Sequence, residues 1–126
     1  MKYKRKSLDE KKIIIRLVIV LVIILIFTFI DYLAHQTSEE YSVPSRYFTN
    51  KVIYGTLICF ISLFFLRKFN FFTKGILFSA IIAVLLQIRY FIEGYPLEFV
   101  LEFLLFHFLM LAPISVLAFW LFGKHV

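Results

Sequence analysis

Four long apolar segments, separated by short polar stretches, dominate the pattern of the chain. A bilayer core is about 30 Å thick, and a helix needs about 20 residues to cross it. The second segment, residues 52–66, is shorter than this. It reaches full length if its helix begins just after Pro44, because proline is favoured at the start of a helix. The pattern therefore predicts an all-α bundle of four transmembrane helices, at about residues 13–34, 45–66, 71–91 and 97–122.

The composition supports lipid as the solvent for these segments. Hydrophobic residues make up 62% of the chain and charged residues 17%, whereas a soluble domain is about half apolar and about a quarter charged. A chain of 126 residues leaves much of its surface exposed when it folds alone, so a core cannot hide this excess. Inside lipid every backbone amide needs an internal partner, which favours helices in spite of the many Ile and Val residues. The bilayer is the first expected partner, and we find no signature of nucleic-acid binding.

Lysine and arginine residues are distributed unevenly between the two ends of the predicted helices. If the helices alternate in direction, only Arg46, Lys51 and Arg89 of the 14 basic residues lie on one side. The other eleven lie on the side that holds both termini, and basic residues are retained in the cytoplasm. We therefore expect a multi-pass protein of the cell membrane with both termini cytoplasmic. The eleven residues are Lys2, Lys4, Arg5, Lys6, Lys11, Lys12, Arg16, Arg67, Lys68, Lys74 and Lys124.

The first residues form a basic segment, 1–12, which we expect to lie in the cytoplasm ahead of a single domain, 13–126. Within it, the sequence SLDE from Ser7 to Glu10 matches a capping box and predicts that a helical lead-in starts there. The apolar run that follows is longer than the roughly 7–15 residues of a signal peptide, so we expect the first helix to be retained.

Polar side chains from all four predicted helices gather near the outer face. Glu102, for example, lies five residues into the fourth helix, about 7–8 Å inside at 1.5 Å per residue. Charged groups in lipid usually face the bundle interior, pair with one another and mark functional sites. We therefore expect a polar network in the outer third, with the candidates Asp31, His35, Arg46, Asn50, Lys51, Tyr54, Gln87, Arg89, Glu98, Glu102 and His107.

Three interpretations of this network stay open. In the favoured one, the groups pair and fix which helices touch, with Glu102 bonded to Arg89, and the protein is a non-catalytic membrane subunit or scaffold. In the second, the same Glu and Arg serve a small transporter or channel component, because intramembrane ionisable groups carry protons and ions. In the third, the i,i+4 pairs Asp31–His35 and Glu98–Glu102 hold Zn²⁺ or Fe²⁺ in a membrane-embedded enzyme.

We predict no cofactor and no stoichiometric metal. Arg89 and Lys51 are expected at the depth of the carboxylates, where a cationic side chain competes with a metal for the same oxygens. A tight site also needs more than one nitrogen ligand. His107 follows Glu102 by five residues and so points about 140° away around the helix. The sequence therefore predicts that His107 stays outside any metal site and bonds to a neighbouring helix.

Small residues recur on two of the predicted helices at spacings that let membrane helices approach closely. We expect both stripes to be internal seams of the bundle. The alternative is that they face a second copy of the chain, in a homo-oligomer, or another membrane protein. The stripes are Gly55, Cys59 and Ser62 on the second helix, and Gly75, Ser79 and Ala83 on the third.

Overall fold

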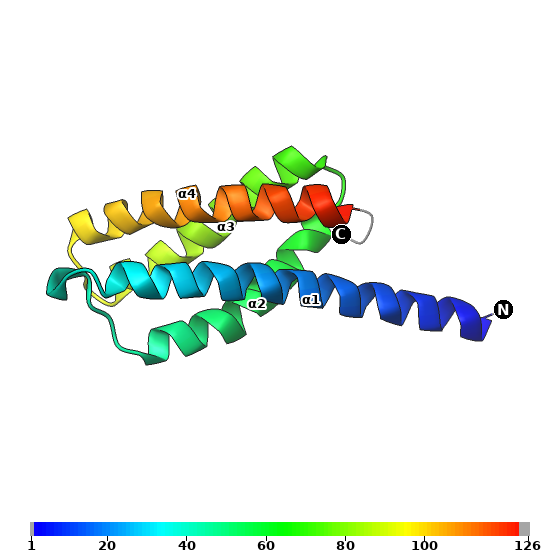
Figure 1. Ribbon diagram of the computed structural model, residues 1–126, viewed down its shortest axis with the longest axis horizontal. Helices are drawn as coiled ribbons and strands as arrows, with labels where there is room; N and C mark the ends of the chain where they lie inside the picture. The colour runs from blue at the N-terminus through cyan, green and yellow to red at the C-terminus, as the bar shows by residue number, and fades with distance from the viewer. Residues whose placement is uncertain (1, 124–126) are drawn as a thin grey trace.

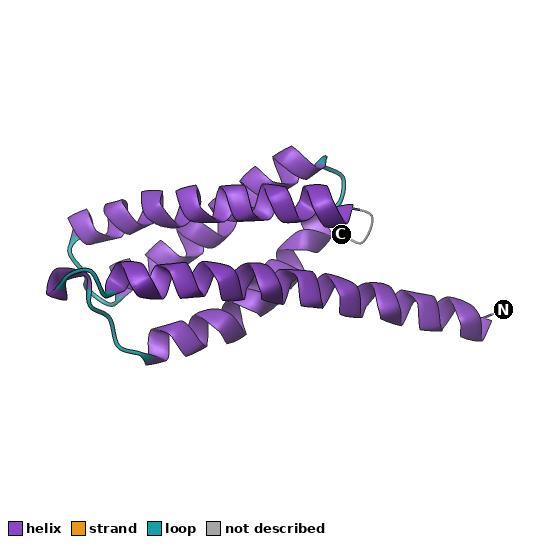
Figure 2. Cartoon of the chain, viewed as in Figure 1, coloured by secondary structure: helices purple, strands orange, loops and turns teal. Residues whose placement is uncertain are grey.

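The structure, a computed structural model, describes the backbone of residues 2–123 and the side chains of residues 9–123. Over this range the chain consists of helices and the loops that join them (Figure 2). All four α-helices are long and apolar enough to cross a membrane, as the sequence predicted. The elements are α1 (Lys2–His35), the short 3-10 helix η1 (Glu39–Tyr41), α2 (Arg46–Leu66), α3 (Phe71–Ile92) and α4 (Leu97–Phe122).

The helices run up and down in an antiparallel bundle (Figure 1). The N-terminal end of α1, the connection between α2 and α3, and the C-terminal end of α4 lie at one end of the bundle. The loop that carries η1 and the connection between α3 and α4 lie at the other end. Short connections of this kind make consecutive helices antiparallel neighbours.

The first helix starts far earlier than the predicted boundary at residue 13. It begins at Lys2, so Ser7 lies inside α1 and the expected capping box is wrong. Residues 2–12 contain no Gly or Pro and are rich in Lys, which is a good helix former. A helix nucleated in the apolar segment therefore extends backwards at little cost, because propagation needs no new nucleus. The other helix ends agree with the prediction to within one residue.

Local signals fix both ends of α3, whereas α4 runs through an internal proline. Asn70 caps α3, since its side-chain oxygen accepts a hydrogen bond from the backbone amide of Thr73 at 2.8 Å. Gly94 follows α3 with a φ of 86°, a left-handed conformation that favours glycine. Pro113 does not end α4, which continues through it to Phe122.

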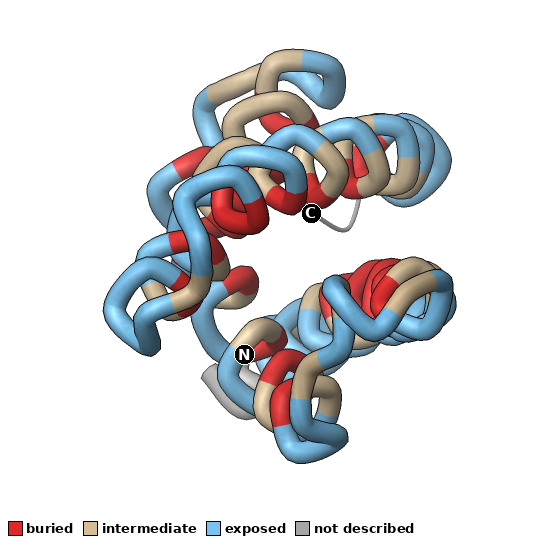
Figure 3. The backbone as a smooth tube through the Cα atoms, turned by 90° about the vertical axis from the view of Figure 1, so that its left-hand side faces the viewer, coloured by how far each residue is buried: buried red, intermediate tan, exposed pale blue. Residues whose placement is uncertain are grey.

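The buried residues lie on the faces that the four helices turn toward one another (Figure 3). They form an apolar cluster toward the end with the termini, in which Phe27, Phe78 and Phe119 are almost fully buried. A second cluster, which includes Tyr90 and Phe103, lies toward the opposite end. Both clusters contact the polar residues described below, so the polar network lies between them.

Most residues of the two small-residue stripes are buried, and Gly55 alone among them is partly exposed. Ser79 and Ala83 are buried on α3, and Cys59 on α2 is fully buried. Two helices approach closely at Gly75, where an added Cβ would lie 2.5 Å from Cγ2 of Val116 and 2.9 Å from its Cα. The glycine therefore allows the backbones of α3 and α4 to approach closely, as small residues do in membrane bundles.

Candidate functional site

The carboxylate of Asp31 lies at the centre of a buried polar network. On α2, the Lys51 ammonium donates a hydrogen bond to Oδ2 of Asp31. On α4, Nε2 of His107 lies 2.7 Å from Oδ1. Lys51 also donates to the Tyr90 hydroxyl of α3 at 3.0 Å. Asp31 is fully buried, and it is thus connected to each of the other three helices, directly or through one neighbour.

The histidine of α4 continues this network toward α3. Nδ1 of His107 lies 2.6 Å from Nε2 of Gln87, and both side chains are buried. If Nε2–H of His107 donates to Asp31, its Nδ1 is an acceptor and takes a hydrogen bond from the Gln87 amide. Phe27 packs edge-on against the imidazole at 5.3 Å between ring centroids. This geometry fixes both the position of the ring and the direction of its two nitrogens.

His35 lies one helical turn beyond Asp31 and is almost fully buried. Its Nδ1 is 2.6 Å from the backbone oxygen of Tyr41 in η1. A carbonyl only accepts, so Nδ1 carries a proton and donates it. Nε2 faces Oδ1 of Asp31 at 3.4 Å and has no hydrogen-bond partner in the described part of the chain. The ring stacks on Phe103 with centroids 4.2 Å apart.

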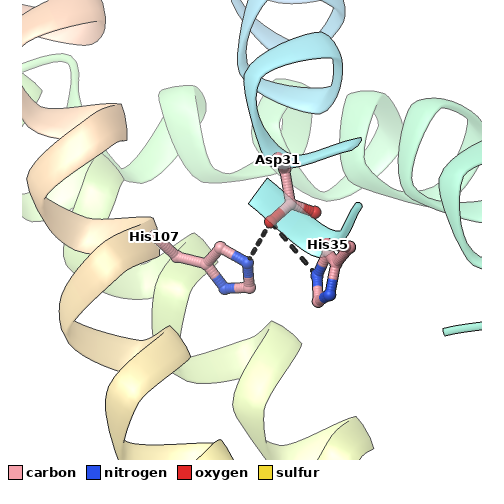
Figure 4. Close-up of side chains that lie close together, drawn as sticks. All are labelled: Asp31, His35 and His107. Atoms are coloured by element: carbon pink, nitrogen blue, oxygen red, sulfur yellow. Dashed lines mark hydrogen bonds and ion pairs between the residues drawn. The ribbon is translucent and has the colours of Figure 1, made fainter. Parts of the chain in front are cut away.

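Asp31, His35 and His107 converge on one point (Figure 4). Each offers one atom of a type that binds metals, and these atoms lie within 4.8 Å of one another. The expectation that His107 lies apart from such groups is wrong. His107 does point away from Glu102 on its own helix, but its carboxylate partner, Asp31, belongs to α1.

The expected pair between Glu102 and Arg89 is also wrong. Arg89 donates from Nε to Oε1 of Glu93, one turn along α3, at 3.2 Å. Glu102 is exposed. Its hydrogen bond with the Tyr41 phenol and its negative charge raise the pKa of that phenol. The reason is the orientation of α4: the face with His107 turns into the bundle, and Glu102, about 140° around, therefore turns out.

The remaining predicted candidates lie outside the central network. Arg46 and Glu98 are exposed. Asn50 and Tyr54 line a groove of about 400 Å³ between α2 and α3, which Lys51 also reaches. A second cavity, of about 320 Å³, is lined by Ala34, Thr37, Tyr41, Glu102, Phe103 and Phe106.

Two residues that contact the network are absent from the sequence-based candidates. Tyr90 bonds to Lys51, and its position three residues after Gln87, on the same face of α3, was a usable signal. Tyr41 contributes a backbone oxygen to His35, and a backbone group leaves no mark in the sequence. No family model, characterised protein or solved structure matches the chain, so its function has to be argued from this geometry.

Proposed function

We propose that the protein is a multi-pass protein of the cell membrane with both termini cytoplasmic, acting as a non-catalytic membrane subunit or scaffold. The observation that carries this proposal is the network around Asp31, which takes side chains from all four helices. Between helices in lipid there is no hydrophobic driving force, so packing and interhelical hydrogen bonds decide which helices associate. A network that includes every helix fixes one arrangement of the bundle and of the surface that it presents to a partner.

The outward-facing residues support insertion into lipid. Large apolar side chains on several helices point away from the bundle, with Phe29 at 64%, Phe65 at 75% and Ile92 at 76% exposed. Soluble proteins rarely expose contiguous apolar surface of this extent. A bilayer covers such a surface without any further partner.

The orientation follows from basic residues at the helix ends. The bundle end that holds the start of α1 and the connection between α2 and α3 is the end on which the sequence concentrates Lys and Arg. Under the positive-inside rule this end faces the cytoplasm. Residues 1–12, 67–71 and 123–126 are then inside, and residues 36–45 and 92–96 are outside.

Cysteine labelling in intact cells tests this topology. Cys59 is the sole cysteine, so a Cys59→Ala background allows single cysteines to be placed at exposed positions Glu39 and Lys68. We expect an impermeant maleimide to label Glu39→Cys in intact cells and Lys68→Cys only after the membrane is opened. Labelling of Lys68→Cys from outside would contradict the proposed orientation.

The scaffold role predicts that single bonds of the network contribute to stability. Tyr90→Phe removes the hydroxyl that accepts from Lys51 and leaves the shape of the ring unchanged. Hydrogen bonds to charged groups contribute about 1.5–3 kcal/mol to stability. Because other groups can partly replace the Tyr90 hydroxyl as an acceptor for Lys51, we expect a loss of stability near the lower value. The buried Cys59 thiol reports opening of the bundle through its rate of reaction with a maleimide in mild detergent.

The matched control is Tyr54→Phe, which removes the same hydroxyl from an exposed tyrosine of α2. We expect Cys59 of the Tyr90→Phe variant to react about ten times faster than Cys59 of the control, since about 1.4 kcal/mol corresponds to a factor of ten. Equal rates in the two variants would count against a network that fixes the bundle.

A further inference from the structure

The bond from His35 to Tyr41 leaves a bare nitrogen facing a carboxylate. Nδ1 must donate to the Tyr41 oxygen at 2.6 Å, so in the neutral ring the lone pair of Nε2 points at Oδ1 of Asp31, 3.4 Å away. Two buried acceptors that face each other are unfavourable: Oδ1 accepts from His107, whereas Nε2 of His35 has no hydrogen-bond partner among the described residues. The arrangement calls for a positive species between them.

The three side chains match the ligand preferences of a divalent transition metal. Two imidazoles and one carboxylate are found in sites for Zn²⁺ and for Fe²⁺. With bonds of about 2.0–2.2 Å, ligand atoms around a tetrahedral ion lie about 3.4 Å apart. Oδ1 of Asp31 is already 3.4 Å from His35 Nε2 and 2.7 Å from His107 Nε2. Because all three ligand atoms lie within 4.8 Å of one another, side-chain movements of about an ångström would bring them to the spacing of a tetrahedral ion.

Each histidine also has an outer partner of the kind that metal ligands use. Metal-bound histidines usually donate their second ring N–H to a carbonyl or carboxylate, which fixes the tautomer. His35 does so toward Tyr41. His107 does so once the Gln87 amide, which faces it at 2.6 Å, turns over and offers its oxygen, since an amide has a donor on one side and an acceptor on the other. Gln87 can thus serve His107 with or without a metal.

From these observations we infer that Asp31, His35 and His107 form a binding site for Zn²⁺ or Fe²⁺. This inference goes beyond the scaffold role and replaces the sequence-based expectation that no metal binds. Lys51 occupies Oδ2 of Asp31 and leaves Oδ1, which faces both imidazoles, to the ion. Its positive charge opposes a cation, so Lys51→Met is expected to bind metal at least as tightly as the wild type.

The positive species that competes with a metal ion between His35 and Asp31 is a proton on Nε2 of His35, which makes His35 an imidazolium paired with Asp31. The two cases are distinguished by a titration of the metal-stripped, detergent-solubilised full-length protein with Co²⁺, whose visible absorption reports coordination by nitrogen and oxygen. We expect one Co²⁺ per chain and displacement by one equivalent of Zn²⁺. Elemental analysis after gentle purification measures metal retained from the cell.

The variants His35→Ala and His107→Ala should each bind the metal ion at least one hundred times more weakly, because each loses a ligand. Gln87→Leu should bind it about ten to one hundred times more weakly, because it removes the outer hydrogen-bond partner of a ligand. The matched control is His125→Ala, which removes the third histidine of the sequence and should leave binding unchanged. Circular dichroism shows whether each variant keeps its helices.

The inference would be overturned if the wild type bound less than one tenth of an equivalent of both Co²⁺ and Zn²⁺. That result does not depend on whether any variant folds. Binding that persists in both His35→Ala and His107→Ala would overturn it as well, because the metal would then sit elsewhere. Neither result touches the scaffold proposal, which depends on stability measured without metal.

Discussion

Lys51→Met should destabilise the bundle by about 3–5 kcal/mol, the largest single-site effect that we expect. The substitution leaves the Asp31 carboxylate fully buried without the ammonium that pairs with it. His107 still contacts the carboxylate through the other oxygen, from which Nε2 of His35 lies 3.4 Å away, but neither neutral ring replaces the positive charge. Removing one partner of a buried ion pair costs this much because the remaining charge has lost both water and its counter-ion.

The double variant Asp31→Asn, Lys51→Met should recover most of that loss. It removes both charges, and replacing a whole buried ion pair by uncharged residues often leaves stability unchanged. Unfolding in dodecylmaltoside with increasing sodium dodecyl sulfate, in the presence of a chelator, measures the wild type, the single variants Lys51→Met and Asp31→Asn, and the double variant without a contribution from metal. The coupling between the two sites is then obtained as a double-mutant cycle.

Lys11→Met is the matched control for this measurement, since it removes the charge of an exposed lysine on α1. It should change stability by less than about 0.5 kcal/mol, as surface substitutions usually do. A Lys51→Met variant as stable as Lys11→Met would contradict both the buried ion pair and the scaffold role that depends on it.

The lengths of the apolar segments were enough to predict four helices, and Pro44 helped to place the start of the second. The start of α1 was not predictable in the same way, because the change from basic to apolar residues at residue 13 is a change of composition, which under the proposed topology marks the membrane surface. It does not interrupt the helical backbone, which starts at Lys2. Composition reports where a membrane begins, whereas helix ends depend on caps and breakers.

The site was predictable in its members and not in its contacts. Asp31, Lys51 and His107 are conspicuous because polar groups are rare in apolar helices. Which of them meet depends on the rotation of each helix about its own axis, and this follows from packing over the whole bundle. On α4, Phe103 and His107 share the buried face while Glu102 is exposed, a choice that the sequence of α4 alone does not make.

The close approach of α3 and α4 makes Gly75→Ala the second substitution with a large expected effect. In an isolated helix Ala is favoured over Gly by about 1 kcal/mol. Here the new Cβ would lie 2.9 Å from both the backbone nitrogen and Cα of Val116. Backbone atoms cannot rotate away as the end of a side chain can, so α3 and α4 have to separate. Overpacking typically costs about 1–3 kcal/mol, and we expect a loss toward the upper value.

Gly123→Ala is the matched control, because an added Cβ there meets nothing within 4 Å and φ is −56°. Unfolding by dodecyl sulfate should show a loss of stability for Gly75→Ala and no loss for Gly123→Ala. Adding Val116→Ala should rescue Gly75→Ala only in part: it removes the Cγ2 contact at 2.5 Å but leaves both backbone contacts. Full rescue would place the clash on the side chain alone, and equal stability of the two glycine variants would contradict the close approach of α3 and α4.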